Sequence, residues 1–176
     1  MEKKSDRRFK EGNISLILDN YDDIFSDFDP RPYTVRALSD DFLNECKKAI
    51  ADKGNQIELR FLLPKKERNK DDEQGIKKRL RHHFQKHYFE KHREIRKIRT
   101  NGILWFFLGA IIMSAGTFLY KMQGFFFNFL FILAEPSGWF FFWEGLGKIF
   151  ITSKTKLPDY IFYKKMSNAE IIFSDY

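Results

Sequence analysis

Residues 103–120 read ILWFFLGAIIMSAGTFLY, a stretch of 18 residues without a charged side chain. At about 1.5 Å per residue, a helix of this length covers most of the ~30 Å hydrocarbon core of a bilayer. We therefore expect a membrane protein whose first transmembrane helix occupies residues 103–122. The stretch excludes a purely soluble enzyme domain.

A second aromatic run begins after a short polar break at residues 121–124. Residues 103–151 contain 12 of the 21 Phe and all 3 Trp of the chain, but only four charged residues. This composition is typical of lipid-facing helices. We assign a second transmembrane helix to residues 125–151, so the two helices form a transmembrane hairpin.

Glycines are spaced by seven residues along the first transmembrane helix, at Gly102, Gly109 and Gly116. Such a strip of small residues allows another helix to approach closely. The spacing therefore favours helix packing within an oligomer.

The hairpin is flanked by cations on its outer sides. Arg93, Arg96, Lys97 and Arg99 precede it, Lys148, Lys154, Lys156, Lys164 and Lys165 follow its second apolar run, and the turn carries only Lys121. Because loops rich in Lys and Arg stay on the cytoplasmic side, we expect both termini in the cytoplasm.

The second transmembrane helix contains two polar side chains that share a face, Asn128 and Glu135. Glu135 lies about 15 Å along the helix, close to the bilayer midplane, so it is expected to face protein or water. One interpretation is a contact that holds an oligomer together. Another is an ion path between several chains, with both residues lining the pore, and a proton-coupled transporter is a third.

Pro136 and Gly138 follow Glu135 directly along this helix. Proline removes an amide donor, and the Ser-Gly pair that follows it weakens the helix further. We expect a kink or a break at this point.

The basic charge of the chain is concentrated in residues 65–99. This segment holds 14 of the 31 Lys and Arg but only 6 of the 24 Asp and Glu, a net charge of +8. No Gly or Pro separates Ile76 from Asn101, so we expect a juxtamembrane helix over residues 65–102 that continues into the first transmembrane helix. Its apolar stripe is Ile76, Leu80, Phe84, Tyr88, Ile95 and Ile98.

This basic helix is expected either to contact anionic lipid or to bind the phosphates of a nucleotide or oligonucleotide. The candidate phosphate-binding residues are Lys77, Lys78, Arg79, Arg81, Lys86 and Arg93. All four histidines lie on the same helix, where solvated side chains, a titrating patch and a zinc site are the open alternatives. We expect no metal and no cofactor.

The remaining sequence predicts one small cytosolic α+β domain at residues 1–64. Residues 13–18 (NISLIL) and 56–63 (QIELRFLL) read as strands, and Ser39 reads as the N-cap of a helix that ends before Gly54. The C-terminal segment, residues 152–176, contains a strand at 169–174 that is expected to return to this domain. Cys46 lies among apolar helix positions and is expected to be a buried reduced thiol.

An acidic loop follows the first strand and contains Asp22, Asp23, Asp27 and Asp29. It lacks the spacing and the glycine of a calcium loop, so pairing with the basic helix or solvation is expected. No nucleophile, base and orienting group can be assembled from the residues of the chain, so we expect no enzyme and no catalytic residues.

Residues 20–33 (NYDDIFSDFDPRPY) and 133–146 (LAEPSGWFFFWEGL) resemble a family of small two-span bacterial membrane proteins, mostly without assigned function. The layout is also similar to the membrane effectors of Hailong-type antiphage systems, in which a nucleotidyltransferase product controls an oligomeric channel. The resemblance implies a bacterial inner-membrane protein and a tetramer-like homo-oligomer. It also implies an oligonucleotide that opens or closes the pore and a nucleotidyltransferase as system partner.

The leading hypothesis is therefore an oligomeric ion-conducting protein of the lipid bilayer. Asn128 and Glu135 would lie near its pore, and its basic helix would respond to a ligand. The alternative is a membrane anchor or scaffold that recruits a cytosolic partner through the α+β domain.

Overall fold

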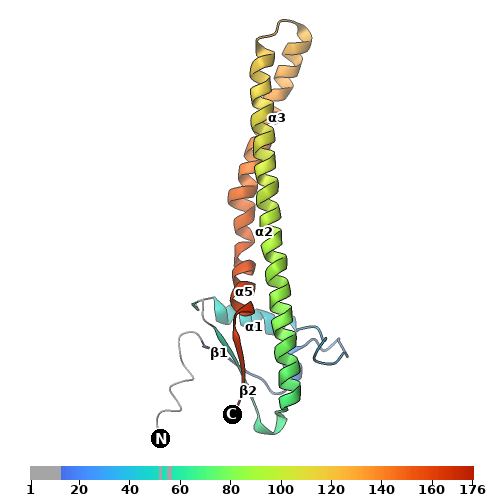
Figure 1. Cartoon of the computed structure of the whole chain (residues 1–176), viewed down its shortest axis with the longest axis vertical. Coiled ribbons are helices and arrows are strands. Elements are labelled where there is room, and N and C mark those ends of the chain that lie inside the picture. Colours follow the sequence, from blue (N-terminus) through green and yellow to red (C-terminus); the bar gives the residue numbers. More distant parts are fainter. Residues whose placement is uncertain (1–12, 52, 55–56) are drawn as a thin grey trace. The chain divides into compact units, whose positions relative to one another are not determined.

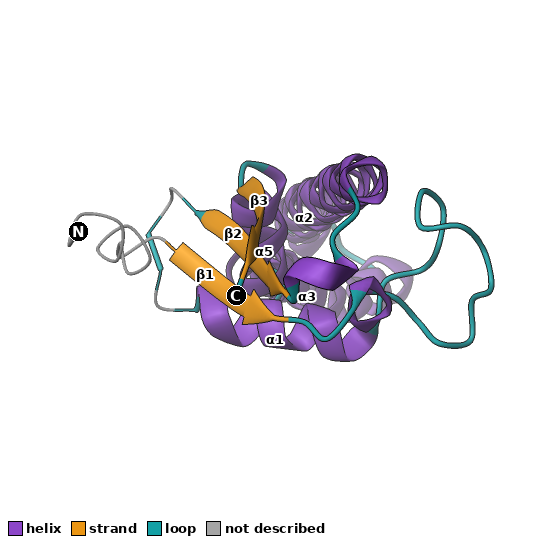
Figure 2. Cartoon of the chain, turned by 90° about the horizontal axis from the view of Figure 1, so that it is seen from below, coloured by secondary structure: helices purple, strands orange, loops and turns teal. Residues whose placement is uncertain are grey.

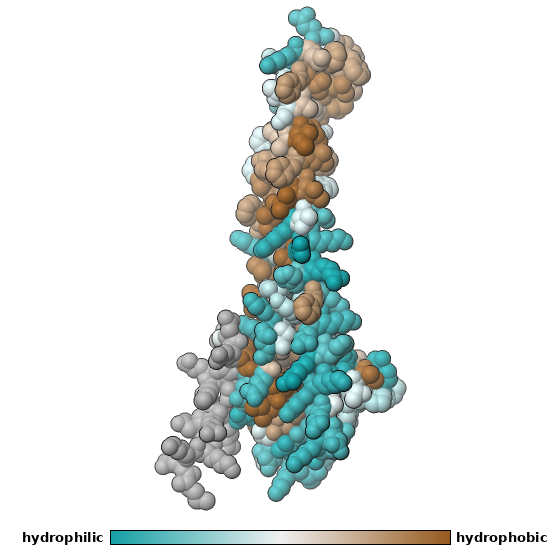
Figure 3. Space-filling model, viewed as in Figure 1, coloured by the Kyte–Doolittle hydropathy of each residue, from teal (hydrophilic) through white to brown (hydrophobic). Residues whose placement is uncertain are grey.

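The computed structural model describes residues 13–51, 53–54 and 57–176. The chain divides into two compact units. The residues up to Phe89 and those from Tyr160 to Tyr176 form the first, here called the sheet unit, and Glu90–Asp159 form the second, the hairpin unit. Figure 3 shows hydrophobic side chains gathered over the hairpin helices and hydrophilic ones over the sheet unit.

The sheet unit contains a three-stranded sheet in the order β1-β2-β3. Its strands are β1 (Asn13–Ile17), β2 (Glu58–Leu63) and β3 (Glu170–Asp175), and all are parallel. Figure 2 shows β2 between the other two strands. The returning C-terminal strand is confirmed, since Phe173 pairs with Phe61 in the register of β2 and β3. The sequence predicted these strands but not their parallel direction.

Parallel strands require crossover connections. The short 3-10 helix η2 (Tyr21–Ile24) and helix α1 (Asp40–Ile50) connect β1 to β2. After the 3-10 helix η3 (Lys65–Glu67), the connection from β2 to β3 contains both hairpin helices and then helix α5 (Leu157–Ser167). Figure 1 shows α5 leading into the final strand. No pattern in the sequence predicted helix α5.

The core of the sheet unit lies on one face of the sheet. Alternate residues of β2, Leu59, Phe61 and Leu63, are fully buried, as expected for a strand with one covered face. Ile76 and Phe84 of the apolar stripe are also fully buried, which confirms this part of the predicted stripe.

Helix α1 begins where the sequence predicts, directly after Ser39, although the Ser39 side chain makes no capping hydrogen bond. Its apolar positions include Cys46, which is fully buried with a free thiol. Burial raises the pKa of the Cys46 thiol to about 12. The prediction of a buried thiol at Cys46 is therefore confirmed.

The acidic loop is held by contacts within itself. Asp22 forms an ion pair with Arg36 over 2.5 Å, and Asp29 pairs with Arg31 over 2.7 Å. Asp29 also accepts the amide of Ala37 at 2.6 Å. The Arg31 side chain and then the Ala37 amide hold the pKa of the Asp29 carboxyl well below its usual range. The expected pairing of Asp22 and Asp29 with the basic helix is wrong. Both carboxylates pair instead with arginines of their own loop, which are closer in sequence.

The hairpin unit begins within helix α2 (Lys70–Tyr120), which is 51 residues long and continues from the basic segment into the first apolar stretch. A turn at Gly124, with φ of +128°, leads into α3 (Phe125–Gly147). The helical path continues through a π-helix, η4 (Lys148–Thr152), and α4 (Ser153–Thr155). The predicted continuity of the basic helix with the first apolar stretch is confirmed.

Two helical stretches, Lys70–Tyr120 and Phe125–Thr155, are long and apolar enough to cross a membrane. In their most apolar windows only 17% and 6% of the residues are buried. A helix from the core of a soluble protein would be mostly buried. The exposure of these two stretches is therefore consistent with contact with lipid.

The two hairpin helices pack through glycines. A Cβ atom on Gly109 would lie 2.5 Å from the Phe142 nitrogen and 2.7 Å from the Gly138 carbonyl oxygen. A Cβ atom on Gly145 would lie 2.7 Å from the Gly102 carbonyl oxygen. The close approach predicted for the glycine strip is confirmed, but the partner of Gly102 and Gly109 is the chain's own α3.

Pro136 lies inside α3, which is continuous from Phe125 to Gly147. The predicted break is therefore wrong, while a bend at Pro136 stays a prediction. The Ser137 hydroxyl donates to the Leu133 carbonyl at 2.7 Å and so supports the backbone next to the proline. Gly138 contributes to packing against α2 at Met113.

Candidate functional site

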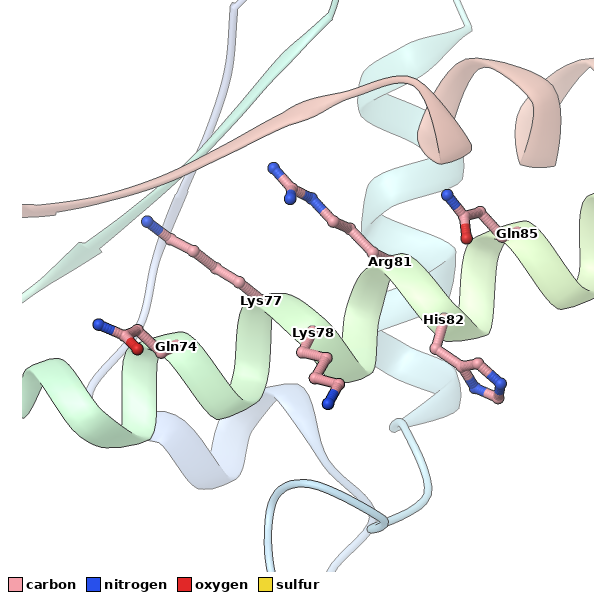
Figure 4. A pocket seen from close by; sticks show the side chains of 6 residues that line it. All are labelled: Gln74, Lys77, Lys78, Arg81, His82 and Gln85. Atoms are coloured by element: carbon pink, nitrogen blue, oxygen red, sulfur yellow. The ribbon is translucent and has the colours of Figure 1, made fainter.

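The strongest candidate site in the sheet unit is a polar face of α2. Its side chains line a shallow hollow of about 420 Å³ (Figure 4). We call this set of residues the basic face: Gln74, Lys77, Lys78, Arg81, His82 and Gln85. The spacing of three, one, three, one and three residues places them on one side of a helix. The opposite side carries the buried stripe that includes Leu80.

The cations of the basic face extend to its two edges. Figure 4 shows Lys77 and Arg81 extending toward the ribbon of β3 and α5, while Lys78 and His82 extend the other way. The Lys77 ammonium lies 5.6 Å from the centre of the Phe173 ring, a cation–π contact that orients it. An anion over this face could therefore be approached from two sides.

The cations of the basic face lack carboxylate partners. Within the described part of the chain, Lys77, Lys78 and Arg81 make no ion pair. By contrast, Arg68 is paired with Glu73 at 2.8 Å. Three uncompensated cations within two helical turns attract a multiply charged anion, and phosphate groups suit both Lys and Arg.

The other predicted phosphate-binding residues lie elsewhere. Arg79 is turned toward the acidic loop, where its Nε donates to the Arg36 carbonyl at 2.8 Å. Lys86 is exposed further along α2, outside the hollow, and Arg93 belongs to the hairpin unit. Gln74, His82 and Gln85 were not predicted as part of this face. Their helical spacing from Lys77 and Lys78 could have revealed them.

Two of the histidines pack against α5. The His83 and His87 ring centroids are 4.3 Å apart, and His87 stacks on Tyr163 at 5.1 Å. The pKa of His83 is lowered to about 4, mainly by burial and to a smaller extent by repulsion from His87 and nearby cations. Its buried Nε2 has no hydrogen-bond partner in the described chain. No group of three or more His, Cys, Asp or Glu side chains among the described residues could hold a metal ion.

The hairpin unit contains the second candidate site, the two polar residues of α3. Asn128 and Glu135 are both exposed. Neither side chain makes a hydrogen bond or an ion pair within the residues that the structure describes. Glu144 on the same helix differs, because it is paired with Lys148 one turn later. Glu135 is thus an acid on a mostly apolar helix, and no described residue of its own chain is its partner.

The two candidate sites have different chemistry. The basic face offers uncompensated positive charge for a polyanion. Asn128 and Glu135 offer polar atoms that other chains or water could contact. Comparison of the chain with protein-family models, with curated proteins and with solved structures finds no match.

Proposed function

We propose that the protein is an oligomeric ion-conducting membrane protein. The observation that carries the proposal is Glu135 on the mostly apolar helix α3. It is exposed together with Asn128 and has no partner within the described chain. An acid near the centre of a bilayer costs about 2.5–3.5 kcal/mol on insertion scales. That cost favours an arrangement in which Glu135 faces water or another polar group.

The ion path would lie between chains. The glycine contacts bring the backbones of α2 and α3 together at Gly109 and Gly138, which leaves no room for a path between the two helices of one hairpin. Several hairpins are therefore needed to surround a pore, with Asn128 and Glu135 repeated around its axis. The resemblance in layout to antiphage channel effectors favours a tetramer-like homo-oligomer.

The orientation follows from the distribution of cations. Basic residues lie before the first apolar stretch and after the second, while the turn carries only Lys121. This asymmetry supports a multi-pass membrane protein with both termini in the cytoplasm. The resemblance in layout supports the bacterial inner membrane as its location. The sheet unit would then be cytosolic, on the same side as a cytosolic ligand.

The ligand would be a nucleotide or oligonucleotide, bound through its phosphates at the basic face. Helix α2 carries both this face and the first apolar stretch, so a ligand that changes the packing of α2 would act on the hairpin without a flexible linker. An antiphage role with a nucleotidyltransferase as system partner is part of this proposal. It is supported by the resemblance in layout.

Ion conduction is tested with the purified full chain in planar bilayers, recorded with and without an oligonucleotide. We expect conductance that Glu135→Gln changes in size or ion selectivity. Glu144→Gln is the matched control, since Glu144 already has Lys148 as its partner. The absence of conductance in either ligand state, or a monomeric mass in detergent, would contradict the proposal.

Ligand binding is tested by titrating a fluorescent single-stranded oligonucleotide at several salt concentrations. Contacts with about five phosphates would give a log-log salt slope of about −3.5. Lys77→Gln, Lys78→Gln and Arg81→Gln combined should reduce both the affinity and the slope. A slope near zero would remove the nucleic-acid ligand from the proposal and leave ion conduction to be judged by the bilayer recordings.

A membrane anchor that recruits a cytosolic partner is the second candidate, and Phe28 favours it. This side chain is 98% exposed in the acidic loop. Its neighbour Asp29 is held by a hydrogen bond from the Ala37 amide. A partner captured by the wild type and lost by Phe28→Ser, with no ion flux at all, would support this alternative. Val35, half-exposed in the same loop, provides the control substitution Val35→Ser.

A further inference from the structure

Five exposed cations lie where the apolar stretches of the hairpin unit end. None of them forms an ion pair with a carboxylate in the described residues. We call them the collar: Arg93, Arg96, Lys97 and Arg99 of α2, and Lys154 of α4. The collar is distinct from the basic face, which belongs to the sheet unit.

Nearby carboxylates are already compensated by other lysines. Glu94 accepts from Lys156 at 3.1 Å and pairs with Lys91 at 3.4 Å. Asp159 pairs with Lys91 at 3.6 Å. The hydrogen bond from Lys156, together with Lys91, lowers the pKa of Glu94, so this carboxylate stays ionised beside its lysines. These acids therefore leave the positive charge of the collar uncompensated.

If the apolar stretches are embedded, Arg99 and Lys154 of the collar lie at the depth of lipid headgroups, and the long side chain of Arg96 reaches that depth from just outside it. Arg96 and Arg99 precede Ile103 by seven and four residues, which is about 10 Å and 6 Å along a helix. Lys154 follows Ile151 by three residues, or about 5 Å. The headgroup region extends roughly 5–8 Å beyond the hydrocarbon core on each side.

Aromatic and basic side chains already meet at this level. The Lys148 ammonium lies 4.5 Å from the Trp105 ring centre. Tryptophan is enriched at the boundary between hydrocarbon and headgroups. Arg99 is positioned from the side by a 3.5 Å contact between its Nε and the Ser153 hydroxyl, a contact that leaves its two Nη groups available to a phosphate.

We propose that the collar binds the phosphate groups of anionic phospholipids. The proposal rests on the membrane insertion proposed above, but not on ion conduction or on an oligonucleotide ligand. Net-negative lipids are selected over zwitterionic ones because the collar supplies positive charge that no carboxylate of the hairpin unit cancels. The guanidinium groups of Arg96 and Arg99 add the geometry for two parallel hydrogen bonds to one phosphate.

The test uses the full chain in phosphatidylcholine vesicles with a small amount of spin-labelled phosphatidylglycerol or spin-labelled phosphatidylcholine. Electron spin resonance gives the association of each labelled lipid with the protein. We expect a clear preference for phosphatidylglycerol, which falls by up to about fivefold for each cation removed by Arg96→Gln, Arg99→Gln or Lys154→Gln. The control removes the same charge from the basic face with Lys77→Gln, Lys78→Gln and Arg81→Gln and should keep the preference.

Each contrary result is assigned to one cause. Equal association of the two lipids with the wild type, or an equal loss of preference in the control, would overturn the collar proposal while leaving ion conduction intact. Abolition of the preference by inorganic phosphate, but not by chloride at the same ionic strength, would assign the collar to free phosphate and overturn the lipid proposal. A chain that does not enter vesicles of any composition would overturn the membrane proposal and this one together.

Discussion

The sheet unit and the hairpin unit use opposite rules of packing. The sheet unit buries large side chains such as Phe61 and Phe84 completely. The hairpin unit brings helices together through glycines and leaves large side chains such as Phe107 and Ile111 more than half exposed. Burial of apolar area is the main gain only where the alternative solvent is water. The difference favours different surroundings for the two units, water for the sheet unit and lipid for the hairpin unit.

The largest effect is expected in the core of the sheet unit. Phe61→Ala should lower the free energy of unfolding by about 3–5 kcal/mol, because it removes a fully buried ring between Phe42 and Phe173 and leaves a cavity. Chemical denaturation of the full chain, followed at the sheet unit, measures the change. A loss below about 1 kcal/mol would mean that this core is not packed as described.

The next effect tests the glycine contacts of the hairpin unit. Gly109→Ala should destabilise the hairpin by about 1–3 kcal/mol, since the new methyl group would overlap the backbone of α3 at Phe142. Gly116→Ala is the matched control, because its Cβ would lie 3.7 Å from the nearest side-chain atom. Denaturation in detergent compares the two variants, and equal stability would contradict close packing at Gly109.

Acidification should weaken the contact between α2 and α5. His83 has a pKa of about 4 in the folded chain, below the 6.5 of an ordinary histidine, so the unfolded chain binds more protons between these values. The stabilising contribution of the neutral imidazole is complete above about pH 6.5 and falls as the pH approaches 4. At pH 5 the loss should be about 2 kcal/mol.

His83→Phe keeps a ring at this position without the titrating group, and His82→Gln changes an exposed histidine. Unfolding free energies from pH 7 to pH 4.5 should fall less steeply for His83→Phe than for the wild type. His82→Gln should follow the wild type. Parallel curves for all three proteins would show that His83 titrates like an ordinary histidine.

The smallest effect concerns the outer surface of the hairpin. Phe107→Ala should change the stability of the hairpin in detergent by less than about 0.5 kcal/mol. The Phe107 side chain is exposed and takes no part in the glycine contacts between α2 and α3. The comparison with Phe61→Ala then separates the two packing rules directly. A destabilisation as large as that of Phe61→Ala would place Phe107 in a buried interface.

The elements of the fold follow largely from local patterns. The alternation in β2 and the apolar stripe through Ile76, Leu80 and Phe84 are visible in the sequence because burial repeats with the period of each element. Strand direction is different, since it depends on where each crossover returns. Helix α5 escaped prediction because its mixture of Tyr, Lys and apolar residues forms no clear stripe, although Pro158 in its first turn is typical of a helix start.

The candidate sites were predictable as far as they depend on composition. Charge alone identified Lys77, Lys78 and Arg81, but helical phase turns Arg79 toward the Arg36 carbonyl. The close helix approach was also visible in the glycine spacing. Its partner was not recognised, although Gly138 and Gly145 repeat the same interval of seven on the second helix. Tertiary partners of this kind require both helices to be read together.

The insertion of the hairpin between β2 and β3 imposes an order on biogenesis. The ribosome must synthesise both apolar helices before it produces Ile171 and Phe173, which complete the core over β2. If the hairpin does not bring β3 back to β2, one edge of β2 stays unpaired and part of the core stays exposed. Such unpaired edges and exposed apolar surfaces favour aggregation. Closure of the sheet unit is therefore coupled to completion of the hairpin, because β3 can pair with β2 only after both hairpin helices have been made.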